Sequence, residues 1–163
     1  MARSMPEVTT VSAPNAANEY LWEDEPGQRT NAAGLRDYQA TTVRILIVDD
    51  DPTIRSVLEA LLEDEGFTPV TAANGQEAVN IVRDSPPALV LMDLMMPVMN
   101  GVEAARTLKS EPKTANVPII AMSAGFILRE SIDDLLADSI ISKPFDLDAL
   151  IANIRATLRR AGE

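Results

Sequence analysis

The stretch LVLMDLMMPVMNG, residues 89–101, decides the fold of this chain. Its first four residues are apolar, and an apolar run of this length bounded by turn residues predicts a buried β-strand. Asp93 follows directly, and a methionine-rich turn with Pro97 and Gly101 comes after it. In open α/β sheets, ligands bind in the crevice at the carboxyl ends of the strands. We therefore expect Asp93 to take part in the chemistry of the protein.

The same pattern of an apolar run followed by a helix recurs along the chain. Other runs of strand length lie at residues 45–48, 67–72, 117–122 and 139–141. Apolar residues with helical spacing predict one helix from Pro52 to Gly66, three more at 76–84, 102–109 and 129–136, and a last one capped by Asp146. Strands without polar alternation, separated by helices, indicate a parallel sheet covered on both faces. We therefore predict an α/β fold, a doubly wound five-stranded parallel sheet with five helices.

The first predicted helix has clear start and stop signals. We interpret Asp51 as its N-cap rather than as a metal ligand, and Pro52 as its first residue. Gly66 is expected to close it. One inward apolar face is expected to hold Ile54, Val57, Leu58, Leu61 and Leu62.

The first 42 residues differ from the rest of the chain. They are rich in Ala, Asn, Thr, Pro and Glu, and their apolar residues follow no sustained period. Such a segment buries too little apolar surface to offset the entropy lost on ordering. We predict a disordered or mobile N-terminal extension over residues 1–42 and one folded domain over residues 43–163. A short docking segment around Tyr20, Leu21 and Trp22 is the alternative for the extension.

The composition restricts the classes of function. The 163 residues include no cysteine and no histidine, so a metal must be bound by oxygen ligands, which favours Mg²⁺ over zinc. The formal net charge of -11 argues against a nucleic-acid surface. No apolar run reaches the roughly 18–20 residues of a membrane span, and the N-terminus lacks the apolar core of a secretory signal. We expect a soluble, cytoplasmic protein that contacts neither nucleic acid nor membrane.

Polar residues follow four of the predicted strands. Asp49 and Asp50 come after the first strand, Asp93 after the third, Ser123 after the fourth and Lys143 after the fifth. The carboxyl ends of parallel strands share one edge of the sheet, so we expect these side chains to lie together. A divalent cation and the lysine ammonium would relieve the repulsion between the carboxylates. A carboxylate nucleophile, a cation, an ammonium and a hydroxyl donor together suit phosphoryl transfer.

Four motifs occur in a fixed order: ILIVDDDPTIR at 45–55, LVLMDLMMPVMNG at 89–101, IIAMSA at 119–124 and SKPF at 142–145. Together they resemble the receiver domain of bacterial two-component response regulators, over about Val43 to Arg160. The resemblance implies a flavodoxin-like sheet with the strand order 2-1-3-4-5. It also implies that Asp93 accepts a phosphoryl group from a histidine kinase or a phosphotransfer protein.

The resemblance also implies a metal site. Asp49 and Asp50 match the acidic pair that binds Mg²⁺ in this family, together with the phosphoacceptor Asp93. The backbone carbonyl two residues after the phosphoacceptor completes the protein ligands, and in this chain that carbonyl belongs to Met95.

Ser123 and Lys143 match the hydroxyl and the lysine of the family, and the bond to Pro144 is expected to be cis. Two features depart from the family pattern. Ile140 occupies a position that is commonly aromatic, so the usual coupling between a hydroxyl residue and an aromatic ring is not expected to report phosphorylation. The segment 123–143 is shorter than is common, which predicts a trimmed fourth helix. Both departures bear on the usual signalling face of the fourth helix, fifth strand and fifth helix.

We predict a stand-alone receiver domain that signals to a partner protein by a conformational change. The sequence does not identify that downstream protein, and a homodimer is compatible with it. We do not expect an enzyme with a dissociable substrate. One alternative is a receiver-like interaction module that phosphorylation does not regulate. A less favoured one is a Mg²⁺-dependent phosphatase with an aspartate nucleophile, because such enzymes usually carry the nucleophile after the first strand and a cap over the site.

Overall fold

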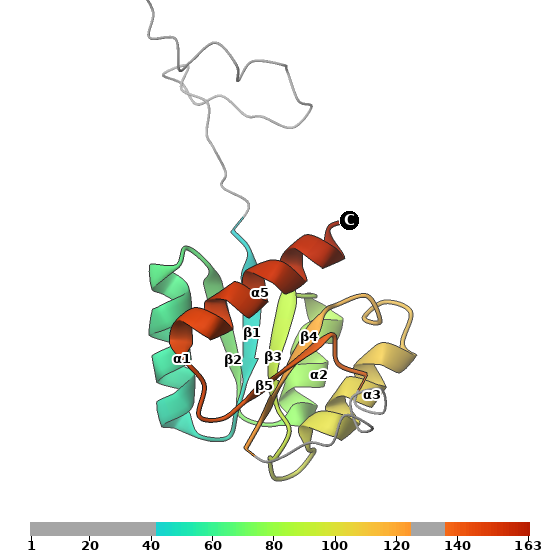
Figure 1. The fold of residues 1–163 in the computed structure, drawn as a ribbon. Coiled ribbons are helices and arrows are strands. Elements are labelled where there is room, and N and C mark those ends of the chain that lie inside the picture. The colour runs from blue at the N-terminus through green and yellow to red at the C-terminus, as the bar shows by residue number, and fades with distance from the viewer. Residues whose placement is uncertain (1–41, 125–135) are drawn as a thin grey trace, which may run out of the picture. The chain divides into compact units, whose positions relative to one another are not determined.

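The computed structural model of the protein describes residues 42–124 and 136–163. They form a five-stranded parallel sheet with helices on both faces (Figure 1). The strands are β1 (Arg44–Val48), β2 (Thr68–Ala72), β3 (Leu89–Asp93), β4 (Ile119–Ser123) and β5 (Ser139–Ser142). The helices are α1 (Pro52–Asp64), α2 (Gly75–Asp84), α3 (Gly101–Ser110) and α5 (Leu147–Ala161). The strand order β2-β1-β3-β4-β5 confirms the predicted flavodoxin-like α/β topology.

The described residues contain four helices rather than the predicted five. The helix predicted at 129–136 lies outside them except for Leu136, and so does its predicted trimming. The predicted N-terminal extension also lies outside them, apart from Thr42. Within residues 42–124 and 136–163, no helix combines the length and the apolar character that crossing a bilayer requires.

The central strands β1, β3 and β4 are buried on both faces, because helices cover each side of the sheet. One layer of the core joins the sheet to α2 and α3, and it includes Leu46 and Ala104. The other layer joins the sheet to α1 and α5, and it includes Ile47 and Leu58. Neighbouring residues of β1 thus belong to opposite layers, which explains why its apolar run lacks polar alternation.

The predicted signals at the ends of α1 are confirmed. The Asp51 side chain accepts hydrogen bonds from the backbone N–H groups of Thr53 and Ile54, and Pro52 is the first helical residue. Gly66 follows the helix with a φ of +85°, a left-handed conformation that glycine adopts without a steric penalty. The cap at Asp51 fixes where α1 begins, and therefore where the loop that carries Asp49 and Asp50 ends.

The prediction for Val57 was wrong, since this residue is 49% exposed. Leu58 and Leu62, four residues apart, are the residues of α1 that are buried against the sheet. The side chain of Val57 leaves the helix about 100° away from that of Leu58. Two strands also begin later than predicted. The N–H of Phe67 donates to the carbonyl of Leu62 in the last turn of α1, and the N–H of Val117 donates to the carbonyl of Thr114, so the ladders start at Thr68 and Ile119.

Strand β2 forms one edge of the sheet. The N–H of Thr68 donates to the carbonyl of Val43, 3.0 Å away, so Thr68 directs its backbone groups toward β1. Successive residues of a strand direct these groups to opposite sides, and the nitrogen of Pro69 therefore faces away from the sheet.

Candidate functional site

The carboxyl ends of β1 and β3 bring three acidic residues together. Asp49 and Asp50 begin the loop after β1, and Asp93 is the last residue of β3. One carboxylate oxygen from each lies within 4.8 Å of the others. Asp49 is 1% exposed and Asp93 is 4% exposed, whereas Asp50 is open to solvent. The structure therefore places the predicted acidic residues in one cluster at the predicted edge.

Lys143, in the connection after β5, balances part of this negative charge. Its Nζ lies 2.7 Å from Oδ2 of Asp49 and 3.4 Å from Oδ2 of Asp93. The ammonium donates its short hydrogen bond to Asp49 and is the cation between the two buried carboxylates. The peptide bond between Lys143 and Pro144 is cis, as the resemblance implied.

Burial sets the protonation properties of Asp93 and Lys143. Removal from water raises the pKa of Asp93, and the nearby charge of Asp49 raises it further. The N–H of Met95, which donates to Oδ1 of Asp93 at 3.2 Å, and the Lys143 ammonium oppose this rise only in part. For Lys143, burial alone would lower the pKa. The hydrogen bond to Asp49 and the charges of both aspartates outweigh it, so the pKa of Lys143 is raised.

All four polar atoms of Asp49 are engaged. Its N–H donates to the carbonyl of Ala72, and its Oδ1 accepts from the N–H of Asp51 at 2.9 Å. Its Oδ2 accepts from Lys143. Its main-chain carbonyl accepts from Nη1 of Arg55 at 2.7 Å. The sequence reasoning missed Arg55, although its position four residues after the N-cap Asp51 places it in the first turn of α1, close to the loop.

Ser123 is the last residue of β4, is buried, and lies next to the end of β3 in the sheet. Its carbonyl accepts from the N–H of Lys143 at 2.6 Å, so the ends of β4 and β5 are joined at the site. Met95 directs its N–H to Asp93, and the residue as a whole is 74% exposed. The expected metal bond from the Met95 carbonyl stays a prediction. Ile140 packs, half-buried, beside Leu94 and Ala121.

Two glycines let the loop after β3 pack closely. A Cβ on Gly101 would lie 2.2 Å from the carbonyl oxygen of Asp93, and one on Gly75 would lie 2.6 Å from the carbonyl oxygen of Met99. Real Cβ atoms do not approach so closely, so side chains at these positions would displace the loop. In the same loop, Val98 has a φ of +70°, which is rare for a β-branched residue. The loop that follows Asp93 is thus tightly constrained.

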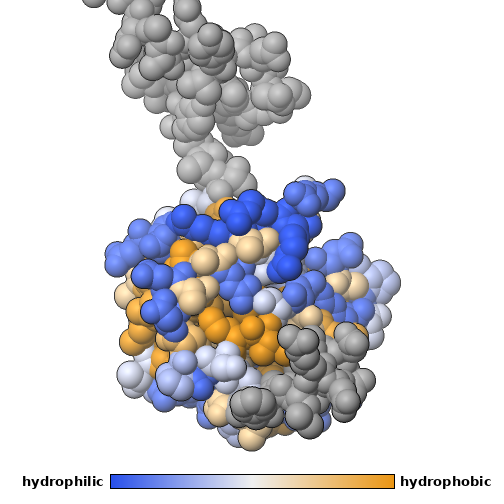
Figure 2. Space-filling model, in the orientation of Figure 1, coloured by the Kyte–Doolittle hydropathy of each residue, from blue (hydrophilic) through white to orange (hydrophobic). Residues whose placement is uncertain are grey.

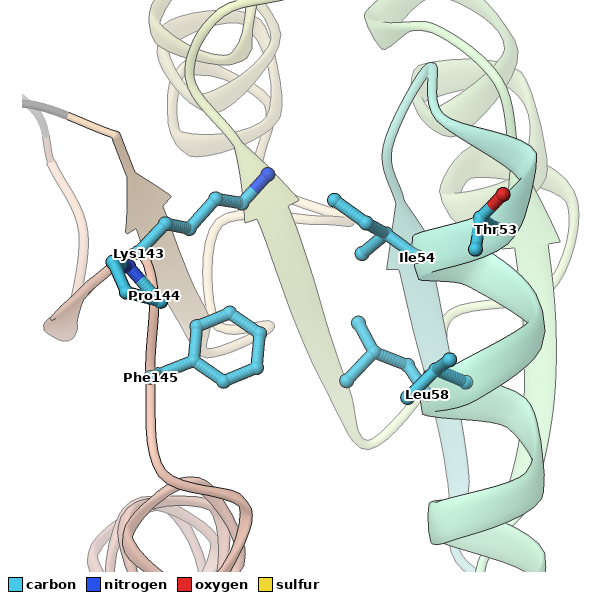
Figure 3. A pocket seen from close by; sticks show the side chains of 7 residues that line it. Thr53, Ile54, Leu58, Lys143, Pro144 and Phe145 are labelled. Carbon is cyan, nitrogen blue, oxygen red and sulfur yellow. The ribbon is translucent and has the colours of Figure 1, made fainter.

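An apolar pocket of about 350 Å³ adjoins the acidic cluster. Ile54 and Leu58 of α1 lie across it from Phe145, and Lys143 extends its ammonium group toward the end of β3 (Figure 3). The exposed Val57 also lines it, which explains where this residue points instead of into the core. In the space-filling view, hydrophobic residues gather in the middle of one face, below a hydrophilic rim along α5 (Figure 2). The pocket therefore offers an apolar surface beside the charged groups.

Comparisons with known proteins agree with this geometry. Residues 45–155 match the model of the family described as response regulator receiver domain. The DNA-binding response regulator MtrA of Mycolicibacterium smegmatis is 39% identical over 122 residues, which cover 72% of this chain and 51% of MtrA. The chain thus spans about half the length of the curated relatives it matches, and these relatives lend no support to the predicted stand-alone type.

Two solved structures are similar over most of their length. The receiver domain of Francisella response regulator 1452 is 26% identical, with a TM-score of 0.67 over 73% of this chain and 98% of that domain. Response regulator TrrA from Thermotoga maritima, solved in complex with Mg(2+)-BeF, is 33% identical, with a TM-score of 0.64 over 70% of this chain and 97% of TrrA. By its matched sequence, its fold and the residues at the end of its sheet, the chain belongs to the response regulator receiver domain family.

Proposed function

We propose that this receiver domain accepts a phosphoryl group on Asp93 in a Mg²⁺-dependent reaction and signals by a conformational change. One observation carries the proposal: Asp93 lies within 4.8 Å of the carboxylates of Asp49 and Asp50 and 3.4 Å from the Lys143 ammonium. Phosphoryl transfer requires a placed nucleophile and positive charge around the transferred group. Both requirements are met here by side chains at the end of one sheet.

The donor set at this edge suits a hard divalent cation. The three carboxylates offer only oxygen ligands, and Mg²⁺ is commonly held by one or two carboxylates while keeping several waters. Asp49, Asp50 and Asp93 would hold the ion, with the carbonyl of Met95 as the further expected ligand. When bound, Mg²⁺ supplies charge that offsets the negative charge of the phosphoryl oxygens. The structure of the relative TrrA in complex with Mg(2+)-BeF supports this assignment.

In the proposed transfer, a carboxylate oxygen of Asp93 forms a bond to phosphorus while the P–N bond of a phosphohistidine breaks. The electron pair of that bond stays on the imidazole nitrogen of the donor. That nitrogen takes up a proton, which leaves the donor residue as neutral histidine. Lys143 needs only a small shift to reach the new phosphoryl oxygens, because it already lies 3.4 Å from Asp93. Ser123, at the end of the neighbouring strand, is the proposed hydroxyl donor to the same group.

The signal is proposed to start from these two residues. An aspartyl phosphate adds strong negative charge, about -1.5 to -2 for a phosphoryl group at neutral pH. A 2.6 Å backbone hydrogen bond joins Lys143 to Ser123. A shift of one residue therefore moves the backbone segment that contains the other. We propose that a partner protein reads this rearrangement.

The phosphoryl donor is proposed to be a histidine kinase or a phosphotransfer protein that covers the apolar pocket beside Lys143. Val57 is exposed there, and burying apolar surface at the site would hold the donor histidine near Asp93. Val57→Glu should therefore slow transfer from the phosphorylated cognate kinase and leave labelling by acetyl phosphate unchanged. Ala60→Glu places the same charge on α1 outside the pocket lining and should change neither rate. Equal transfer from the kinase to both variants would refute this docking position.

Three further parts of the proposal concern the kind of activity, nucleic acid as a partner, and the location of the domain. The domain acts as a phosphoacceptor rather than as an enzyme with a dissociable substrate. Its net charge of -11 disfavours direct contact with nucleic acid, although its relative MtrA is described as DNA-binding. We also propose that it works in the cytoplasm. Electrophoretic mobility of labelled duplex DNA with and without the protein tests the proposed lack of contact with nucleic acid.

Intact mass spectrometry tests the central proposal. The full chain is incubated with acetyl phosphate, and separately with phosphoramidate, whose P–N bond resembles that of phosphohistidine. We expect one added phosphoryl group with MgCl₂, none with EDTA, and none in Asp93→Asn under either condition. An adduct that persists in Asp93→Asn would assign the wrong acceptor. No adduct in the wild type would favour an interaction module that phosphorylation does not regulate, and continuous release of phosphate from small esters would favour a phosphatase.

A further inference from the structure

Arg55 contacts the loop of the acidic pair in two ways. It lies in the first turn of α1, and its side chain is half-buried. Its Nη1 donates to the main-chain carbonyl of Asp49 at 2.7 Å, and its own N–H donates to the carbonyl of Asp51 at 3.1 Å. In residues 42–124 and 136–163 no carboxylate forms an ion pair with this guanidinium. Among these residues, the hydrogen bond of its guanidinium therefore goes to a backbone carbonyl of the loop.

The carbonyl that Arg55 contacts belongs to the peptide unit between Asp49 and Asp50. The orientation of a peptide plane sets the directions in which the side chains on either side leave the backbone. The Oδ1 of Asp49 also accepts from the N–H of Asp51, which closes a short turn over the same peptide. The guanidinium thus holds the peptide that joins Asp49 to Asp50, and rotation of this peptide would turn both carboxylates relative to Asp93.

We propose that Arg55 is a positioning residue for the cation site: by holding the Asp49–Asp50 peptide, it keeps both carboxylates directed at one point beside Asp93. The inference rests on the proposed function, because it concerns the same site. Hydrogen bonds from an ionised donor are stronger than neutral ones, and partners of metal ligands commonly change metal affinity about 10- to 100-fold when removed. Arg55 is such a partner, acting through the main chain of a ligand rather than through its carboxylate.

Positioning and simple electrostatics predict opposite results. Arg55 is a cation close to a cation site, so its charge alone repels Mg²⁺. Removing that charge without any loss of positioning would tighten Mg²⁺ binding. Losing the fixed peptide would instead weaken binding, because the carboxylates would have to be ordered when the ion binds. The direction of the change in affinity therefore separates the two effects.

The experiment measures Mg²⁺ dissociation constants of the full chain by isothermal titration calorimetry, with thermal unfolding in EDTA as a separate readout. Arg55→Met removes the donor and the charge but keeps a long side chain, and Arg55→Lys keeps one cationic donor. Arg159→Met removes an exposed charge in the last turn of α5, at the opposite end of the sheet (Figure 1). We expect about tenfold weaker binding in Arg55→Met, a loss within about threefold in Arg55→Lys, and no change in Arg159→Met.

Several results would contradict the proposed role of Arg55. Unchanged or tighter Mg²⁺ binding in Arg55→Met would overturn the inference, as would a lower unfolding temperature with normal affinity, since that pattern indicates a structural role alone. An Arg55→Lys variant as weak as Arg55→Met would also contradict it, because the remaining donor should still reach the carbonyl. If the wild type binds no Mg²⁺ and takes no phosphoryl group, the proposed function fails and the inference falls with it. If the wild type does both while Arg55→Met binds normally, only the role of Arg55 is refuted.

Discussion

Replacing Lys143 by methionine tests the electrostatic balance of the site. The lysine side chain is 17% exposed and lies 2.7 Å from Asp49, which is 1% exposed. Removing one partner of a buried ion pair costs about 3–5 kcal/mol, because the remaining charge is left uncompensated. Asp49 would keep the N–H of Asp51 and Asp93 would keep the N–H of Met95, which limits the loss. We therefore expect the lower end of this range, a free energy of unfolding reduced by about 3 kcal/mol in EDTA.

Urea unfolding at pH 7.5, followed by circular dichroism, measures this difference. The pKa of Lys143 is raised above 10.5, so while its carboxylate partners are ionised its contribution is fully present below that pH and is lost as the pH rises through the raised value. The deficit of Lys143→Met should shrink in acid, where the carboxylates are neutralised. It should also shrink in MgCl₂, because the ion supplies the missing charge. Lys113→Met, at an exposed lysine, should change stability by less than about 0.5 kcal/mol.

Two results would refute this reasoning. Equal stability of Lys143→Met and the wild type in EDTA would show that the ion pairs contribute nothing. A deficit that is the same at pH 7.5 and in acid would show that it arises from lost packing beside the pocket rather than from charge.

Three other predictions concern the loop after β3. Val98→Gly should stabilise the protein by about 0.5–1 kcal/mol in urea unfolding, because it relieves a φ of +70° at a side chain that is 85% exposed; lower stability would contradict the strain. Gly101→Ala should destabilise by more than about 3 kcal/mol in the same assay, since its Cβ would lie 2.2 Å from the Asp93 carbonyl; a neutral effect would mean that the loop yields easily. Asp93→Asn should be more stable than the wild type in EDTA at neutral pH. The raised pKa of Asp93 means that stability is lost as the pH rises from 3.8 through the folded value, so the advantage should vanish below pH 3.8, and a pH-independent difference would contradict it.

The fold could be predicted from sequence because its signals are local and repeated. The residues from Ile45 to Val48 are apolar without alternation, and all four are buried in the structure. Caps such as Asp51 bond to backbone groups two and three residues away, so their chemistry is visible in a short window. The grouping of Asp49, Asp50 and Asp93 at one edge also followed from topology, since parallel strands end on the same side.

The details that were missed depend on contacts between distant elements. Helical spacing shows that Val57 lies near an apolar face, but not that this face stops at the pocket beside Phe145. Nothing local shows that Lys143 lies closer to Asp49 than to Asp93. Arg55 illustrates the same limit, because an arginine in a helix usually has a solvated head group, and only the geometry shows where its guanidinium points.

Pro69 has a consequence for the protein at high concentration. An edge strand exposes unpaired N–H and carbonyl groups, onto which a strand from another molecule can add. The nitrogen of Pro69 faces outward from β2 and carries no hydrogen, so β2 offers an added strand no hydrogen-bond donor at this position. The residue therefore protects this side of the sheet against intermolecular strand addition and aggregation, without removing any bond that β2 makes to β1.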